Sequence, residues 1–181
     1  MGARQTGKTT LVKRLFPDAQ YLLVDNLPVQ TLLETYDIES YKQAIKKDIV
    51  IIDELHLLSD PGRAAKIIYD QINTKLIITG SSSFHIKNKT SESLAGRKVD
   101  YFLFPLTFSE YLFQTDVIKG LEHNILTNII DQKTVAVKMF DIEHVLNNVL
   151  LYGLFPNMIN NPFDTKYLTS FVDSVVFKDL L

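Results

Sequence analysis

The chain has 181 residues, of which 46% are hydrophobic and 22% are charged. This composition is ordinary for a globular protein with one domain, or with one domain and the start of a second. The net charge of −2 indicates no general attraction to nucleic acid or anionic lipid, and the absence of cysteine excludes disulfides and thiolate metal sites. No apolar run has the length of a membrane span, so we expect a cytoplasmic protein without a membrane partner.

Helices and strands are predicted to alternate over the first 105 residues. The helices are expected at 8–16, after Asn26, through 41–47 and after Asp60. The strands are expected at 21–25, 49–52, 75–79 and 100–104. This alternation indicates an α/β fold in which helices cover both faces of a parallel sheet.

The pattern changes after Pro105. Thr107 and Glu110 fit a capping box at a helix start, and 117–130, 141–151 and 164–181 are predicted to be helical, with no obvious buried strand between them. We therefore divide the chain into an α/β domain at 1–115 and the start of a helical C-terminal domain at 116–181.

Residues 2–9, GARQTGKT, match the phosphate-binding pattern G-x-x-x-x-G-K-[ST] in full. Its glycines let backbone N–H groups point at phosphate oxygens, and the positive end of the following helix favours the same anion. We expect Lys8 to reach the β- and γ-phosphates of ATP and the Thr9 hydroxyl to ligate Mg²⁺. The other residues expected at the nucleotide are Gly2, Arg4, Gln5, Thr6, Gly7 and Thr10, with Arg4 either bracing the loop or touching the nucleotide. The alternative is a glycine-rich turn with an exposed lysine.

Two acids follow the apolar strand at 49–52. Asp53 is suited to hold the Mg²⁺ shell, and Glu54 to act as general base on an attacking water. Ser81 and Ser82 follow the strand at 75–79, where one hydroxyl could sense the γ-phosphate or orient the water. The alternatives are a solvated loop start for the acids and a helix N-cap for the serines.

The segments GARQTGKTTL, IIDELH, IITGSSS, SESLAGR and FPLTFSEYL together resemble a family of prokaryotic AAA+-like ATPases that join an ATPase domain to a C-terminal domain of unknown function. The resemblance covers essentially the whole chain. It implies a P-loop three-layer sandwich with strand order 5-1-4-3-2, with the phosphate loop after strand 1 and the paired acids after strand 3.

The chain departs from the family pattern at three positions, in two places. Leu55 and His56 stand where the family usually has Ile and Gln, and Ala3 stands where it usually has Pro. His56 could still hydrogen-bond near the site, whereas a metal role is disfavoured because no second histidine lies at ligand spacing. Arg97 belongs to a recurring family motif, and an arginine near a γ-phosphate can stabilise transition-state charge. The alternative is a surface arginine that pairs with Glu92 or Asp100.

Three functions compete. The first is an ATPase that uses its nucleotide state to reposition the C-terminal domain, the second a nucleotide-binding interaction module with negligible turnover, and the third a nucleic-acid-associated ATPase. Glu54 favours the first, because a pure binding module needs no positioned base. ATP and Mg²⁺ are the expected ligands, and an unknown protein and further copies of the chain are the candidate partners.

The phosphate loop also leads us to expect that the sequence is a fragment. A buried strand should precede such a loop, but Gly2 is the second residue, and the sequence stops within a predicted helix at 178–181. We therefore expect strand 1 to be missing and the loop to be poorly held at its first residues.

Overall fold

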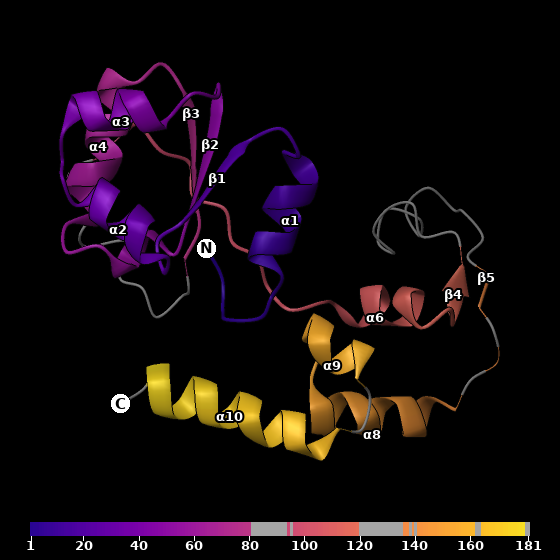
Figure 1. The fold of residues 1–181 in the computed structure, drawn as a ribbon. Helices are drawn as coiled ribbons and strands as arrows, with labels where there is room; N and C mark the ends of the chain where they lie inside the picture. Colours follow the sequence, from indigo (N-terminus) through magenta and orange to yellow (C-terminus); the bar gives the residue numbers. More distant parts are fainter. Residues whose placement is uncertain are drawn as a thin grey trace. The chain divides into compact units, whose positions relative to one another are not determined.

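The chain folds as two compact units, Met1–Leu103 and Phe104–Leu181 (Figure 1). The computed structural model describes residues 1–80, 94, 96–119, 136–137, 139, 141–161 and 164–179. The division into domains at residue 115 stays a prediction.

The first unit is built on a parallel sheet of three strands in the order β1-β2-β3. The strands are β1 (Gln20–Leu23), β2 (Ile49–Asp53) and β3 (Lys75–Ile78). Tyr21 lies opposite Ile51, and Ile51 lies opposite Ile77, so the three strands end at the same edge of the sheet. The predicted α/β fold with a parallel sheet is confirmed. The observed order matches the 4-3-2 part of the expected order, whose remainder stays a prediction.

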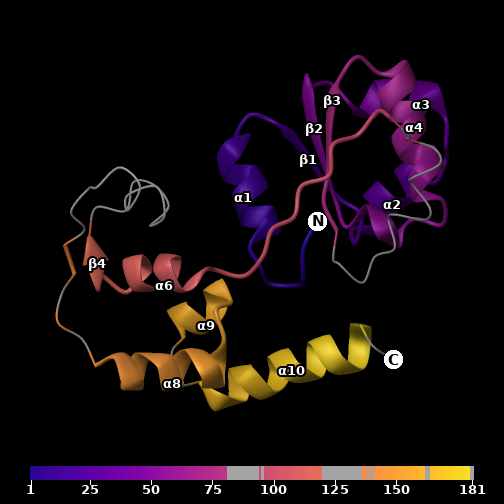
Figure 2. The same ribbon diagram turned by 180° about the vertical axis from the view of Figure 1, so that it is seen from behind.

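Helices lie on both sides of this sheet (Figure 2). In the described part of the first unit, the helices are α1 (Lys8–Leu15), α2 (Leu27–Leu33), α3 (Ile38–Ala44), the 3-10 turn η1 (Leu55–Leu57) and α4 (Pro61–Gln71). Helices α2, α3 and α4 cover one face, and α1 lies over the other. Asp60 caps α4 by accepting a hydrogen bond from the Arg63 N–H at 2.9 Å, at the position predicted for the start of this helix.

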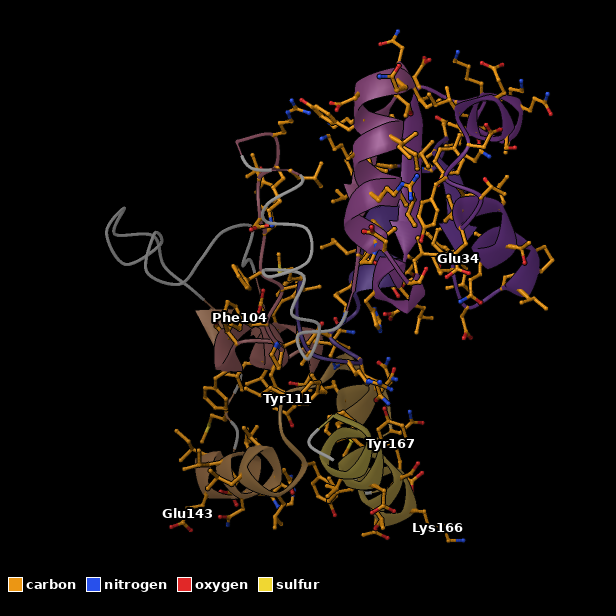
Figure 3. All side chains as sticks on the ribbon, turned by 90° about the vertical axis from the view of Figure 1, so that its left-hand side faces the viewer. Glu34, Phe104, Tyr111, Glu143, Lys166 and Tyr167 are labelled. Atoms are coloured by element: carbon orange, nitrogen blue, oxygen red, sulfur yellow. The ribbon has the colours of Figure 1, made fainter. Side chains whose placement is uncertain are left out.

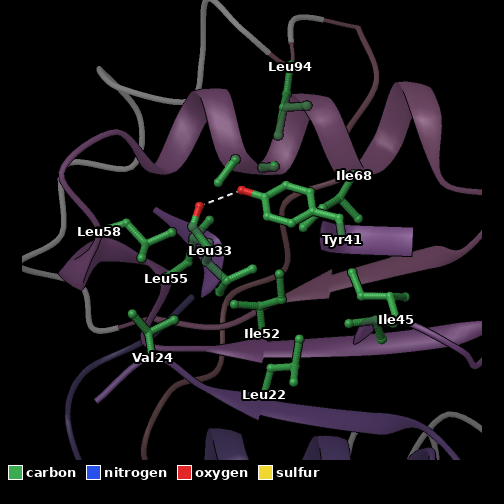
Figure 4. Packing of buried hydrophobic residues seen from close by; sticks show 13 residues of the cluster. Leu22, Val24, Leu33, Tyr41, Ile45, Ile52, Leu55, Leu58, Ile68 and Leu94 are labelled. Carbon is green, nitrogen blue, oxygen red and sulfur yellow. Dashed lines mark hydrogen bonds between the residues drawn. The ribbon is translucent and has the colours of Figure 1, made fainter. Parts of the chain in front are cut away.

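The core fills the space between the sheet and α2–α4 (Figure 4). Val50 and Ile52 belong to this cluster, whereas Ile51 is equally buried but lies outside it, as the alternation of side chains along a strand requires. Tyr41 is fully buried, and its hydroxyl donates a hydrogen bond to the Leu33 carbonyl. The odd-numbered positions of β2 therefore face α1, and this face carries Asp53.

The strand predicted at 100–104 is wrong. The structure has no strand there, and the segment makes two backbone hydrogen bonds with Met1, one from the Met1 amino group to Tyr101 O (2.5 Å) and one from Leu103 N to Met1 O (2.7 Å). A strand of a parallel sheet is bonded along its length to a neighbouring strand, whereas both of these bonds join the segment to the single residue Met1. In this segment Tyr101 and Phe104 are 77% and 74% exposed.

The second unit consists mainly of helices. They are α6 (Phe108–Gln114), α8 (Ile142–Tyr152), α9 (Pro156–Asn160) and α10 (Thr165–Asp179), and Figure 3 shows Tyr111 on α6, Glu143 on α8, and Lys166 and Tyr167 on α10. The capping box at Thr107 and Glu110 is confirmed. None of the helices in the described part of the chain has both the length and the apolar character needed to cross a membrane.

The helix predicted at 117–130 is wrong at its start. Ile118–Lys119 forms β4, which pairs antiparallel with β5 (Ala136–Val137), where the sequence predicted no strand. Asp116 has a φ of 60°, in the left-handed region, which ends the preceding helix and redirects the chain. Two-residue strands carry too little periodicity to be recognised in a sequence. Residues 120–130 lie outside the described residues.

Candidate functional site

The loop before α1 curls through two left-handed residues, Gln5 (φ 62°) and Gly7 (φ 89°). The Thr6 hydroxyl donates to Ala3 O at 3.0 Å and closes the turn. A Cβ on Gly2 would lie 2.2 Å from Leu103 O, so only glycine fits where the loop begins. The loop is thus shaped by its glycines and by one hydroxyl, and it leads directly into the N-terminus of α1, the end of a helix that favours anions.

Lys8 bends back over this loop. Its ammonium group donates to Gly2 O at 2.9 Å and to Ala3 O at 2.6 Å. The side chain is half-buried, unlike the exposed lysine of a plain glycine-rich turn. A positive charge is therefore held at the loop, next to the positive end of α1.

Asp53 is where the sheet and the loop meet. One of its oxygens, Oδ2, accepts hydrogen bonds from Thr9 Oγ1 at 2.6 Å and from Tyr21 OH at 2.5 Å. The other oxygen, Oδ1, accepts from the Thr79 hydroxyl. The register of the sheet brings these three side chains together. Tyr21 on β1 and Asp53 on β2 occupy α1-facing positions, and Thr79, which directly follows β3, continues the same face. Asp53 is only 2% exposed, and both of its carboxylate oxygens accept hydrogen bonds from protein hydroxyls.

The hydrogen bonds decide the charge of Asp53. Burial alone would raise the pKa of its carboxyl, but the bonds from Thr79, Thr9 and Tyr21 outweigh burial and lower the pKa below its ordinary value. Burial and the bond to Asp53 raise the pKa of Tyr21, so its phenol stays protonated and remains a donor. The site therefore contains a buried, ionised carboxylate at neutral pH.

This donor set fits Mg²⁺. Mg²⁺ prefers oxygen ligands and is commonly held by one or two carboxylates together with substrate phosphates. The Asp53 carboxylate and the Thr9 hydroxyl supply such oxygens within 2.6 Å of one another. No cluster of three or more acidic, histidine or cysteine side chains able to hold a metal occurs in the described part of the chain.

Glu54 stands directly after β2 in a left-handed conformation (φ 57°, ψ 39°). This conformation is uncommon for glutamate and turns the chain out of the strand into η1. Glu54 Oε2 lies 3.1 Å from His56 Nδ1, and both atoms are buried. His56, which stands where the family usually has Gln, thus contacts Glu54, the expected general base.

Arg97 contacts α4. Its guanidinium lies 2.5 Å from Asp70 Oδ1 and 6.0 Å from the ring centroid of Tyr69. Asp100, one of the two partners that we considered for Arg97, pairs instead with Lys98 at 3.3 Å. The catalytic role of Arg97 stays a prediction.

Three further predicted residues lie in the phosphate loop and the first turn of α1. Arg4 is half-buried in the loop, while Gln5 and Thr10 are exposed on it and on the first turn of α1. Ser81 and Ser82 lie outside the described residues. The assignment of all these side chains to nucleotide or catalysis stays a prediction.

Sequence reasoning missed two members of the site, Tyr21 and Thr79. Thr79 directly follows β3 and donates to Asp53. It lies two residues before the predicted Ser81. Tyr21 is two residues before the end of β1, and its long side chain reaches diagonally across to Asp53. The register of the sheet places these polar residues on the same face as Asp53, and no local sequence signal gives that register.

Residues 1–112 match the family model described as an AAA domain. The chain belongs to this family. Membership carries a P-loop fold, and such domains typically bind ATP with Mg²⁺.

Two curated relatives are similar to nearly the whole chain. An uncharacterized protein of Methanocaldococcus jannaschii is 27% identical over 202 residues, which cover 99% of this chain and 42% of the relative. An uncharacterized protein of Haemophilus influenzae is 22% identical over 196 residues, which cover 99% of this chain and 44% of the relative. The chain therefore spans less than half the length of these relatives. No solved structure matches it significantly.

Proposed function

We propose that this AAA domain binds Mg²⁺-ATP at the loop 2–9 and hydrolyses it. The hydrogen bond between Thr9 and Asp53 carries the proposal, because it joins the expected phosphate loop to the expected metal-binding acid. A glycine-rich turn formed for other reasons would have no need of a buried carboxylate at this point. Family membership supports the same activity.

Binding divides among three groups. The backbone of the loop and the N-terminus of α1 attract the phosphates, and Lys8 adds a positive charge next to them. Thr9 and Asp53 would hold Mg²⁺, which neutralises charge on the phosphates when bound. Because Lys8 bonds to loop carbonyls in this structure, its ammonium exchanges these partners for phosphate oxygens when ATP binds.

Glu54 is the proposed general base. It directly follows Asp53, and its left-handed backbone turns its side chain away from the regular alternation of the strand. A carboxylate here accepts the proton of the attacking water and leaves the phosphates to Lys8 and the metal. Arg97, Ser81 and Ser82 remain candidates for stabilising or sensing the γ-phosphate.

A binding module with negligible turnover is the second candidate, and one contact favours it. Glu54 Oε2 lies 3.1 Å from His56 Nδ1, so a neighbouring side chain stands next to the oxygen that would accept a proton from water. If this contact persists with ATP bound, the domain holds nucleotide without cleaving it. As an ATPase, the domain would use its nucleotide state to reposition the C-terminal region, whereas as a binding module it would use bound ATP to set its affinity for an unknown protein partner. Association with further copies of the chain is a separate proposal.

Replacing Lys8 by alanine tests the binding site. The variant loses a positive charge against the phosphates, and we expect ATP affinity to fall on the order of 10- to 100-fold. Isothermal titration of wild type and variant measures the change. Lys42→Ala is the matched control, because Lys42 is an exposed lysine that pairs with Glu39. Equal affinities of Lys8→Ala and wild type would refute the phosphate-loop assignment.

A further inference from the structure

Tyr21 is a polar residue of the site that the proposed function does not use. Its hydroxyl donates to Asp53 Oδ2 at 2.5 Å, the same oxygen that accepts from Thr9. Hydrogen bonds of this length from a hydroxyl to a carboxylate belong to the stronger, charge-assisted class. A tyrosine that only filled space between α1 and the sheet would not need this contact.

The ring of Tyr21 is itself held in place. The Lys13 ammonium, on α1, lies 3.7 Å from the ring centroid, within the range of a cation–π contact. On the sheet side, β1 pairs with β2 through Tyr21 and Ile51. The Lys13 contact fixes the ring from α1 and the strand pairing fixes its backbone, and together they limit the positions that the hydroxyl can take.

We propose that Tyr21 is a positioning residue for the divalent cation, because its hydroxyl fixes the Asp53 carboxylate in the orientation in which it binds the metal or a metal-bound water. This inference rests on the proposed function. Thr79 holds Oδ1 while Tyr21 and Thr9 hold Oδ2, so the plane of the carboxylate is set from three elements.

Tyr21 differs from Thr9, the other donor to Oδ2, in one respect. Thr9 is itself an expected metal ligand, so its hydroxyl serves two partners when the metal binds. Tyr21 is not an expected metal ligand, so its hydroxyl keeps its hydrogen bond to Oδ2 when the metal binds. Residues that hydrogen-bond to a metal ligand orient it and tune its affinity, and losing one typically weakens metal binding about 10- to 100-fold.

The test measures metal binding directly. Mn²⁺ is titrated into the protein with a non-hydrolysable ATP analogue, and free Mn²⁺ is followed by electron paramagnetic resonance. We expect Tyr21→Phe to weaken Mn²⁺ binding about tenfold, with its affinity for the analogue in the absence of metal unchanged. Unchanged or tighter Mn²⁺ binding would overturn the proposal, since a merely structural tyrosine does not set metal affinity.

Tyr36→Phe is the matched control. Its hydroxyl also makes hydrogen bonds, with Ser59 Oγ at 2.8 Å and Asp60 N at 3.0 Å, but not with Asp53. It should bind Mn²⁺ like wild type. An equal loss in both variants would assign the effect to general loosening and overturn the role of Tyr21.

A second measurement does not depend on the folding of Tyr21→Phe. All eight tyrosines of the wild-type sequence are replaced by 3-fluorotyrosine, and ¹⁹F spectra are recorded during an Mg²⁺ titration with the analogue bound. We expect one resonance to shift with the midpoint of metal binding. If no tyrosine resonance follows the metal, the proposal fails.

The outcomes separate the two proposals. If wild type binds neither the analogue nor metal, the proposed function and this inference both fail. If wild type binds both and Tyr21→Phe matches it, only the role of Tyr21 fails.

Discussion

The Thr9 hydroxyl donates a hydrogen bond to Asp53 Oδ2 at 2.6 Å, although 44 residues separate the two in sequence. Thr9 is in the first turn of α1, and Asp53 is the last residue of the central strand β2. The bond therefore joins the start of a helix to the end of a strand at the sheet edge where ligands of α/β proteins bind. A change in either residue should alter both phosphate and metal binding.

We expect Glu54→Gln to keep ATP binding and to lose most hydrolysis. The amide has nearly the shape of the carboxylate but cannot accept a proton from water, and general bases contribute roughly 10²- to 10⁴-fold. Phosphate release under saturating Mg²⁺-ATP measures the rate, and isothermal titration measures binding.

Glu39→Gln serves as the control for Glu54→Gln, because Glu39 is an exposed acid that pairs with Lys42. It should hydrolyse ATP like wild type. A wild-type rate in Glu54→Gln would show that Glu54 is not the base. Negligible turnover in wild type as well would favour the binding module.

Asp53 should make stability depend on pH in the acid range. Its pKa is lowered in the folded state, so its contribution to the free energy of unfolding is complete above the ordinary carboxyl pKa of about 4 and is lost as the pH falls through the folded value. Urea unfolding at pH 6 and at successively lower pH measures the loss. Asp53→Asn should be less stable than wild type near neutral pH, and the difference should shrink in acid. A constant difference between the two proteins would contradict this assignment.

The local sequence correctly predicted elements that are marked by an apolar run or a capping motif. The apolar run at 49–52 became the central buried strand β2, and Asp60-Pro61 starts α4. The capping box at Thr107 is present as expected. These features depend on neighbours in sequence, which a pattern can reveal.

Features that depend on distant partners could not be predicted in this way. The segment 100–104 has an apolar, strand-like sequence, but it forms no strand, and Tyr101 O and Leu103 N bond to Met1, about 100 residues away in sequence. The contact of Tyr21 with Asp53 depends on the register of β1 against β2, and that of Arg97 with Asp70 depends on the path of the chain after β3. No local motif encodes either pairing.

Tyr41→Phe should destabilise the first unit without affecting the candidate site. Tyr41 is fully buried and donates to the Leu33 carbonyl, so the variant leaves a buried acceptor without its donor, at a cost of about 1–3 kcal/mol. In urea the unfolding midpoint should fall while the dependence on denaturant stays constant. Because Tyr41 packs on the α2–α4 side of the sheet and Asp53 faces α1, ATP affinity should be unchanged. A loss of affinity at a temperature where the variant is folded would show that the two faces are coupled.

One hypothesis for Arg97 is that it acts on ATP held by a neighbouring copy of the chain. Arg97→Ala should then be inactive, and mixing it with Glu54→Gln should restore activity, because some sites combine an intact Glu54 with an intact Arg97 from the adjacent subunit. Random mixing of equal amounts gives about a quarter of sites this combination in a ring of identical interfaces. Phosphate release from the mixture, compared with each variant alone, measures the recovery.

The pairing of Arg97 with Asp70 supplies the control that separates catalysis from surface packing. If Arg97 serves only to bond Asp70, at 2.5 Å in this structure, then Asp70→Asn and Arg97→Ala should have the same small effect. If Arg97 is catalytic, Asp70→Asn releases it from α4 and leaves hydrolysis intact or faster, while Arg97→Ala abolishes it. Failure of the mixture to regain activity, with both variants folded and associated, would place any action of Arg97 within its own subunit. Equal rates for wild type and Arg97→Ala would exclude a catalytic role.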